Sequence, residues 1–244
     1  MAKRLGNHTV LLENKPCIAG FGSVVGKMEH EGPLGREFDS FSSDSHFGEK
    51  TFEKAESRLQ TLAVGKAIER AGIKDKDIDL VFAGDLLNQC IGSSFGLREL
   101  GIPFLGLYGA CSTMALGTAL ASIMVDCGAA NIAVAATSSH FCSAERQYRF
   151  PLEYGCQRPP TAQWTVTGSG ALVIKLCEEK QLPVIERITF GKIVDLGVTD
   201  ANNMGAAMAP DDVKIRPYPT NEGMVFFYTQ IQYLRGFRAL FKEF

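Results

Sequence analysis

Cys111 is the residue of this chain whose type and setting most favour chemistry. It lies in a corner of small residues, GACST at 109–113, between the apolar run 104–108 and the apolar stretch 114–127. The run predicts a fully buried strand, and the stretch predicts a helix buried in the middle of the fold. A thiol between a buried strand and the positive end of a helix is expected to favour the nucleophilic thiolate. Ser112 suits the helix start, because its side-chain oxygen can accept from backbone N–H groups.

Ordinary packing is the alternative for Cys111, since free cysteine is among the residues most often buried. The chain has seven cysteines, an odd number, and no Cys-x-x-Cys pair. That usage favours a reducing compartment and argues against a disulfide framework or a structural zinc site. We expect no metal site and no cofactor of the protein itself, although Asp85 and Asn88 could help to hold a calcium ion bound with a ligand, and we interpret the other cysteines as packing residues.

Polar side chains follow three of the predicted strands, at the points where these strands end. The strands are expected at 80–83, 104–108 and 131–136. Open α/β sheets bind ligands at the carboxyl ends of their strands, so the three ends are expected to meet at one rim. The residues expected at this rim are Asp85, Asn88, Cys111, Ser112, Ser139 and His140.

The order of the expected elements is strand, helix, strand, helix, strand, helix, strand, strand. This order predicts an α/β layered fold with a mostly parallel sheet and a buried central helix. The first clear helix is expected at 51–71, with Gly72 as its stop. The glycine-rich segment 17–25 is expected to be a loop, because it lacks the ending of a phosphate loop. The β-branched run 165–176 predicts a buried strand, paired with 184–194.

Composition excludes several classes of protein. Hydrophobic residues make up 45% of the chain and charged residues 21%, values typical of a globular protein in solution. The formal net charge of −2 gives no electrostatic reason to propose nucleic acid as a partner. The first residues lack the apolar segment of a signal peptide, and no stretch reaches the ~20 apolar residues that span a bilayer. We expect a protein that is not secreted and that reaches a membrane only by docking.

The composition changes near the carboxyl end. Residues 211–244 hold eight of the 23 aromatic residues of the chain. We therefore divide the chain into a domain at 1–210 and an atypical tail at 211–244. A truncated or frameshifted reading frame is our hypothesis for the tail.

Several long strings, in order and at consistent spacing, resemble one family over about residues 7–210. They are DLVFAGDLLNQ, IPFLGLYGACST, AVAATSSH, SAERQYRFPLEYG, TVTGSGALVI, DLGVTD and MGAAMAP. The family is stage V sporulation protein AD, a thiolase-fold family of spore-forming Firmicutes. The resemblance implies a thiolase-like fold of which this chain holds the N-terminal half only.

The same resemblance implies a function and partners. The family binds dipicolinic acid or its calcium chelate and serves its uptake into the developing spore. Small membrane proteins of the same operon are the implied partners, at the cytoplasmic side of the inner spore membrane, and a homodimer is implied by the likeness to thiolases. The thiolase nucleophile corresponds to Cys111, but the histidine and second cysteine that assist it come from the half that this chain lacks.

Two functions therefore remain open, beside the alternative that a truncated chain performs neither. In the first, the protein is a non-enzymatic binder, and a dicarboxylate ligand calls for cationic groups and hydrogen-bond donors. Arg146 is our main candidate because it is near His140 in sequence, with Arg149 and Arg158 as further cations and Tyr108 or Tyr148 beside the ring. The second function is an acyltransferase with Cys111 as nucleophile and His140 as base.

Overall fold

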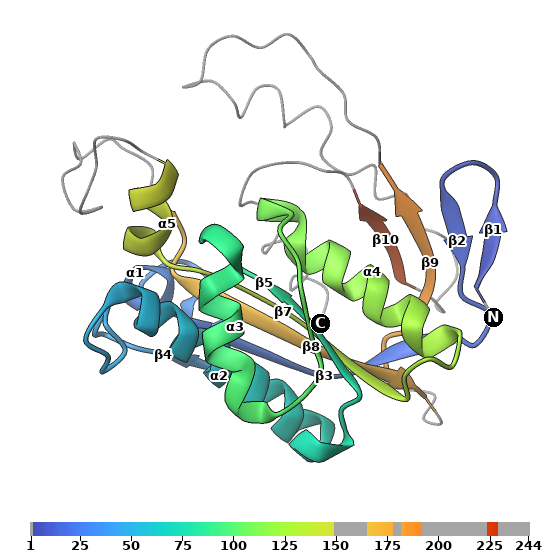
Figure 1. Cartoon of the computed structure of the whole chain (residues 1–244), viewed down its shortest axis with the longest axis horizontal. Coiled ribbons are helices and arrows are strands. Elements are labelled where there is room, and N and C mark those ends of the chain that lie inside the picture. Colours follow the sequence, from blue (N-terminus) through green and yellow to red (C-terminus); the bar gives the residue numbers. More distant parts are fainter. Residues whose placement is uncertain (1, 149–164, 178–181, 192–223, 229–244) are drawn as a thin grey trace, which may run out of the picture.

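Residues 2–148, 165–177, 182–191 and 224–228 are described by the computed structural model, and they form two β-sheets and five α-helices (Figure 1). The six-stranded sheet comprises, in spatial order, β4 (Ser40–Phe41), β3 (Pro16–Val25), β8 (Gly168–Leu176), β7 (Ile132–Ser139), β5 (Leu80–Gly84) and β6 (Phe104–Gly106). The four-stranded sheet comprises β1 (Lys3–Leu5), β2 (Thr9–Leu11), β9 (Ile185–Phe190) and β10 (Met224–Tyr228). The helices are α1 (Lys27–His30), α2 (Phe52–Ala71), α3 (Ile91–Leu97), α4 (Thr113–Asp126) and α5 (Phe141–Tyr148). The predicted α/β class is confirmed.

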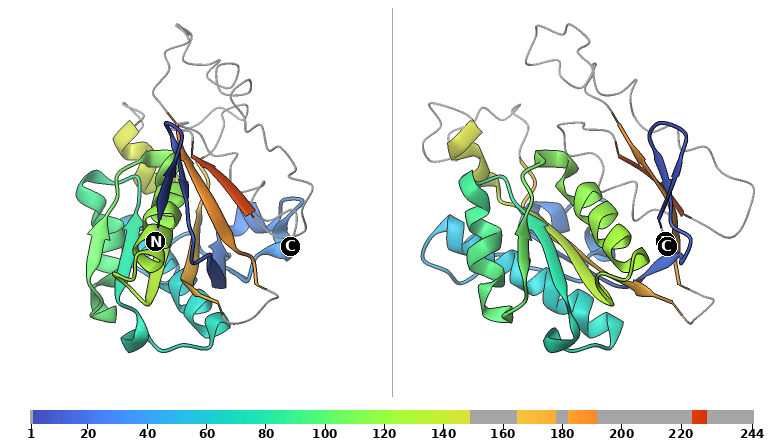
Figure 2. Two further views of the ribbon diagram at one scale, coloured as in Figure 1. Left: turned by 90° about the vertical axis from the view of Figure 1, so that its right-hand side faces the viewer. Right: turned by 45° about the vertical axis from the view of Figure 1, so that its right-hand side comes forward.

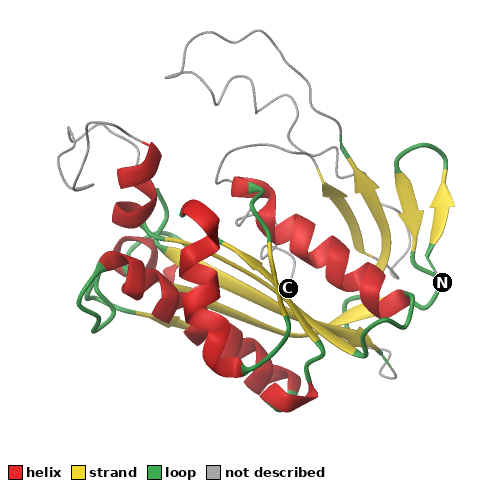
Figure 3. Cartoon of the chain, in the orientation of Figure 1, coloured by secondary structure: helices red, strands yellow, loops and turns green. Residues whose placement is uncertain are grey.

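The elements stack in layers (Figures 2 and 3). Helices α2 and α3 cover one face of the six-stranded sheet, and α4 covers the other face, with the second sheet behind it. Ala121 and Val125 of α4 share a buried cluster with Leu172 of the first sheet and Ile188 of the second. The prediction of a buried central helix is therefore confirmed.

The six-stranded sheet is mixed, which corrects the expectation of a mostly parallel sheet. Strands β6, β5 and β7 are parallel neighbours, but β8 runs antiparallel to both β7 and β3. The pairing of Ser139 with Gly168 puts the start of β8 beside the end of β7, so β8 must run back along it. The apolar run that predicted β8 carries no information on strand direction.

The glycine-rich segment expected to be a loop is the long strand β3. A side-chain carbon at Gly20 or Gly22 would overlap the backbone oxygens of Ala67 or Ala63 in α2. The glycines therefore let the helix lie directly on the strand. Their spacing reflects close packing rather than a turn.

Helix α2 agrees with its prediction almost to the residue. Thr51 is the N-cap, and its side-chain oxygen accepts from the backbone N–H of Lys54 at 3.3 Å. Gly72 ends the helix in the left-handed conformation, with φ 66°. The buried stripe of α2 faces the sheet and shares a core cluster with residues of β5, β7 and β8.

Two further strand predictions are wrong in position. The run 104–108 was expected to be fully buried, but β6 is an edge strand within the described residues, with Phe104 and Leu105 exposed. Strand β9 pairs with β2 and β10 rather than with β8. An apolar run predicts a strand, but it does not say which strand lies beside it.

Cys17 and Cys177 form a disulfide, which corrects the expectation that the cysteines are unpaired. They lie at the start of β3 and after the end of β8, and their Cα atoms are 5.7 Å apart although 160 residues separate them. Antiparallel neighbours bring such distant positions together, and cysteine spacing alone does not reveal it. Cys90, Cys111, Cys127 and Cys142 are free thiols.

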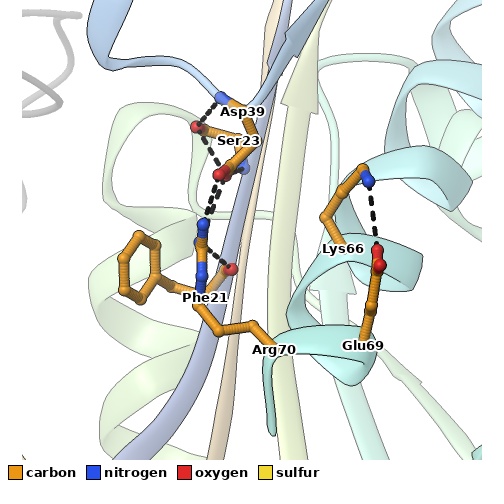
Figure 4. A network of polar contacts seen from close by, with 6 residues as sticks. All are labelled: Phe21, Ser23, Asp39, Lys66, Glu69 and Arg70. Atoms are coloured by element: carbon orange, nitrogen blue, oxygen red, sulfur yellow. Dashed lines mark hydrogen bonds and ion pairs between the residues drawn. The ribbon is translucent and has the colours of Figure 1, made fainter. Parts of the chain in front are cut away.

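A polar network ties α2 to the edge of the sheet (Figure 4). The Arg70 guanidinium donates to the Phe21 carbonyl at 2.6 Å and to Asp39 Oδ1 at 2.5 Å, and it lies 3.9 Å from the centre of the Phe21 ring. Asp39 Oδ2 also accepts from the Ser23 N–H at 2.8 Å. Burial raises the pKa of Asp39, but these hydrogen bonds outweigh it and leave that pKa below its usual value. The network holds the segment before β4 against β3 and α2.

Candidate functional site at the rim of the parallel strands

The carboxyl ends of β6, β5 and β7 lie side by side, as the sequence predicts. Ala83 pairs with Gly106 on one side of β5, and Gly84 pairs with Thr137 on the other. A Cβ at Gly84 would overlap the Leu107 carbonyl and would lie 2.7 Å from the Thr113 methyl group. The turn that carries Cys111 therefore sits directly on the end of β5.

Cys111 lies in a 3₁₀ turn, Ala110–Ser112, before the first residue of α4. Its side chain is partly buried, and burial raises the pKa of the thiol to about 11. The expectation of a favoured thiolate is therefore wrong: removal of water opposes the charge more strongly than the nearby helix start supports it. At neutral pH Cys111 is a neutral thiol.

The hydroxyls beside Cys111 stabilise the turn instead of capping the helix. The Ser112 hydroxyl donates to the Gly109 carbonyl at 2.6 Å, and the Ser112 N–H donates to the same oxygen at 3.0 Å. The Gly109 N–H donates to Thr113 Oγ1 at 3.2 Å. The predicted cap from Ser112 is not formed. The side chain instead shapes the corner that presents Cys111.

Backbone strain gathers at the same rim. Among the described residues five non-glycine residues have positive φ, and three of them flank the rim: Gln89 (59°), Cys90 (53°) and Ala110 (46°). Ala110 directly precedes Cys111, while the other two lie in the turn after β5. Residues held in this region of φ are typical of functional sites, where surrounding packing maintains them.

Asp85 lies at the rim, but its carboxyl group stabilises the surrounding backbone. Its Oδ1 accepts from the Leu87 N–H at 2.8 Å, and its Oδ2 accepts from the N–H and the hydroxyl of Ser93 at 2.7 and 2.6 Å. These contacts hold the turn after β5 to the first residues of α3. Asn88, by contrast, is exposed on that turn.

Ser139 is the last residue of β7 and is only 6% exposed. Its hydroxyl oxygen has no hydrogen-bond partner within the described residues. The preceding residue, Ser138, points to α2, where its hydroxyl donates to Glu56. Because successive side chains of a strand point to opposite faces, the Ser139 hydroxyl points to the α4 face.

His140 is fully buried, and both of its ring nitrogens have partners. Nδ1 accepts from the Cys142 N–H at 3.2 Å, so Nε2 carries the proton and donates to the Ser45 carbonyl at 2.8 Å. The ring also packs against Phe52 and Phe141. This arrangement suits a structural residue better than a general base.

The predicted cations are only partly placed. Arg146 belongs to α5, which begins directly after His140. The structure does not describe the side chain of Arg146, and Arg149 and Arg158 lie outside the described residues. Tyr108, a predicted wall of the site, is 55% exposed beside the cysteine turn.

Glu56 is the residue of this region that sequence reasoning missed. It is fully buried on α2, and its oxygens accept from the hydroxyls of Ser138 at 3.1 Å and Ser143 at 2.5 Å. Burial, with a smaller contribution from Asp85, raises the pKa of this carboxyl to about 8. A signal was available: Glu56 shares the spacing i, i+3, i+7 with Leu59 and Ala63 of the buried stripe.

A cavity of about 290 Å³ lies beside the start of α5. It is lined by Gly26, Lys27, Met28, Glu29, Ser43, Ser45, Phe141, Thr165 and Thr167. None of the predicted site residues is among them. In the described part of the chain, no cluster of three acidic, histidine or cysteine side chains is arranged to hold a metal ion. Nor does any helix there have the length and apolar character needed to cross a bilayer.

The mixed six-stranded sheet, the buried helix and the cysteine turn define a layered α/β domain. Similar solved structures include 3-oxoacyl-[acyl-carrier-protein] synthase III from Aquifex aeolicus VF5, at 17% identity and a TM-score of 0.47, over 68% of this chain and 55% of that one. Another is a variant of OleA from Xanthomonas campestris bound with cerulenin, at 18% identity and a TM-score of 0.48, over 72% and 61%. Similarity this distant assigns no activity.

The sequence also matches the family Stage V sporulation protein AD (SpoVAD) over residues 6–217, and the chain therefore belongs to that family. It is 46% identical over 211 residues to the stage V sporulation protein AD of Bacillus subtilis (strain 168). That match covers 85% of this chain and 61% of the relative, so the chain spans less than two thirds of the relative's length. The family resemblance drawn from the sequence is confirmed.

Proposed function

We propose that this chain contributes to a non-enzymatic protein that binds dipicolinic acid, or calcium dipicolinate, for uptake into the developing spore. Membership of the SpoVAD family supports the sporulation setting. The ligand is a planar ring with two carboxylates, so its site requires hydrogen-bond donors and cations. The observation that carries the proposal is the buried Ser139 hydroxyl, which has no partner within the described residues. A ligand carboxylate that accepts from it would satisfy a group that is otherwise unfavourable to bury.

The predicted site residues take different roles in this proposal. Ser139 and Arg146 contact the ligand, Cys111 lines the site as a neutral thiol, and Asn88 lies at its exposed margin. The residues that shape the surrounding turns are Asp85, Ser112 and His140.

An acyltransferase acting through Cys111 is the alternative. The thiol pKa of about 11 and the engaged ring of His140 weigh against it, because a nucleophilic cysteine needs a thiolate or an adjacent base. The two functions are separated by mass spectrometry after incubation with acyl-CoA. A stable adduct of acyl mass on Cys111 would favour the enzyme, and its absence would favour the binder.

Calorimetry with dipicolinic acid, in the presence and absence of calcium, tests the binding function. We expect Ser139→Ala and Arg146→Ala each to weaken binding by about tenfold, the equivalent of one good hydrogen bond. Ser40→Ala and Arg4→Ala are matched controls, since Ser40 lies on β4, at the opposite edge of the six-stranded sheet from β6, and Arg4 lies on β1 of the other sheet. If the controls weaken binding as much as the test variants, the ligand does not bind at the rim.

We also propose that the protein works at the cytoplasmic side of the inner spore membrane, with small membrane proteins of the same operon, and as a homodimer. The exposed apolar edge strand β6 supports self-association, because an edge strand offers unpaired backbone groups to a second strand. Light scattering of Leu105→Lys tests the dimer. A mass equal to that of the unaltered protein would remove β6 from the interface.

A further inference from the structure

Glu56 connects three elements at one buried point. It lies in the second turn of α2, accepts from Ser138 near the end of β7, and accepts from Ser143 in the first turn of α5. All three side chains are almost completely buried. Each carboxyl oxygen therefore holds a different segment of chain, and the two segments are joined only by Ser139 to Cys142.

The residues that Glu56 holds are direct neighbours of the proposed ligand contacts. Ser139 follows Ser138, and fixing one side chain of a strand on the α2 face fixes the next on the α4 face. Arg146 lies three residues after Ser143, one helical turn further along α5. Glu56 therefore determines the direction of the strand end and the position of the helix start together.

The charged groups near Glu56 favour its uncharged form, so it can contact two serine hydroxyls without placing an ion in the interior. Within the described part of the chain, Asp85 from the end of β5 and Glu53 from α2 are the charged groups that act on it, and both oppose its ionisation. The ring nitrogens of His140, between β7 and α5, are directed at the Ser45 carbonyl and the Cys142 N–H rather than at Glu56. The raised pKa favours the protonated form of Glu56 at pH 7, in which one oxygen accepts from a serine hydroxyl and the protonated oxygen donates to the other, and this avoids the large cost of an unpaired buried charge.

We propose that Glu56 is the positioning residue of this rim, holding the end of β7 and the start of α5 in place so that the Ser139 hydroxyl is presented to a ligand. The ligand part of this inference rests on the proposed function. That Glu56 holds the two segments in place does not depend on the proposed function, and this part is tested separately.

Hydrogen exchange measured by mass spectrometry tests the holding. We expect Glu56→Ala to raise exchange at least about tenfold in peptides covering 137–148, by local opening, and to leave peptides within 17–25 unchanged. Glu56→Gln should restore protection, because an amide can accept from one serine and donate to the other. Gln60→Ala is the matched control: Gln60 is equally buried one turn along α2, but it donates to the Gly84 carbonyl of β5. It should leave exchange at 137–148 unchanged.

If Glu56→Ala does not fold, variants of the two serines test the same contacts one at a time. Ser143→Ala should raise exchange in α5 only, and Ser138→Ala at the end of β7 only. Unchanged exchange in 137–148 for Glu56→Ala, or for both serine variants, would overturn the proposal. A rise of the same size in Gln60→Ala would also overturn it, since general loosening of α2 would then explain the result.

Calorimetry with dipicolinic acid then tests whether Glu56 also positions a group that binds the ligand. We expect about tenfold weaker binding for Glu56→Ala and near-normal binding for Glu56→Gln. If exchange rises but affinity stays the same, Glu56 holds the segments without positioning a ligand group, and that part is wrong. If the unaltered protein binds no dipicolinic acid, the proposed function fails, while the exchange result still decides whether Glu56 holds the rim.

Discussion

The two faces of the sheet differ sharply at the rim. On the face covered by α2 and α3, the carboxyl oxygens of Asp85 and Glu56 all accept hydrogen bonds from neighbouring segments. On the face covered by α4, the Ser139 hydroxyl has no partner in the part of the chain that the structure describes, and Cys111 is partly buried after a strained residue. A buried donor without a partner is typical of a site that awaits a ligand, whereas saturated networks are typical of structural support.

The comparison of the two faces assigns different roles to residues that look alike in the sequence. Asp85, Ser138 and Ser139 are all polar residues near strand ends, yet only Ser139 faces α4. A difference of one position along a strand reverses the face, and therefore separates a supporting residue from a candidate ligand contact. Variants on the α2 face should consequently affect stability, and variants on the α4 face should affect binding.

Removal of the Asp85 carboxyl should give the largest effect. Asp85→Ala deletes the acceptor of three hydrogen bonds and leaves the donors of Ser93 buried, so we expect the free energy of unfolding to fall by about 3 kcal/mol. Urea denaturation measures this change. Asn88→Ala, on the exposed part of the same turn, should change it by less than about 0.5 kcal/mol. Equal effects from the two variants would contradict a structural role for the α2 face.

Alkylation kinetics should show that the α4 face lacks an active nucleophile. With a pKa of about 11, Cys111 has far less thiolate at pH 7 than an ordinary cysteine of pKa about 8.5, so we expect it to react about a hundredfold more slowly. Its rate should keep rising as the pH is raised towards 11. Iodoacetamide labelling followed by peptide mass spectrometry measures this, with exposed Cys127 as the internal control. Faster labelling of Cys111 than of Cys127 at pH 7 would revive the acyltransferase alternative.

The pH dependence of stability should report Glu56. Its pKa is raised from 4.5 to about 8 in the folded protein, so between these values the folded state holds a proton that the unfolded state has lost. Stability should therefore fall as pH rises from about 4.5 to 8, by about 4 kcal/mol relative to Glu56→Gln. Urea denaturation of both proteins across this range isolates the contribution, because the other carboxyls are common to both. Parallel curves would mean that Glu56 is ionised throughout.

The sequence predicted what local pattern encodes. The α2 helix, the buried helix after Cys111 and the shared strand ends all follow from apolar periodicity, glycine stops and polar residues after apolar runs. The family followed from long matching strings. The sequence did not predict which element lies beside each strand. The segment that forms β3 was expected to be a loop, and its Gly20 and Gly22 are explained only by the helix that lies on them.

The sequence predicted that the candidate residues follow neighbouring strand ends, but it did not predict their chemical surroundings. Cys111 was expected to be a thiolate, because helix position can be read from sequence while burial of a side chain cannot. His140 and Asp85 were expected to face a ligand, but their partners, such as Ser45, are far away in sequence or lie on another element. Glu56 was overlooked because a charge on a helix is usually solvated, and only the stripe it shares with Leu59 indicates otherwise.

Ser139→Ala should have the smallest effect on stability and thereby sharpen the comparison most. The hydroxyl has no partner within the described residues, so its removal deletes no hydrogen bond and relieves an unsatisfied buried group. We expect the free energy of unfolding to stay within about 0.5 kcal/mol of the unaltered protein, or to rise slightly. Ser138→Ala, one residue earlier, removes the donor to Glu56 and should lower it by about 1 kcal/mol. Urea denaturation of the two variants decides between the faces: if Ser139→Ala is the more destabilising, its hydroxyl belongs to the structural network and is not kept available for a ligand.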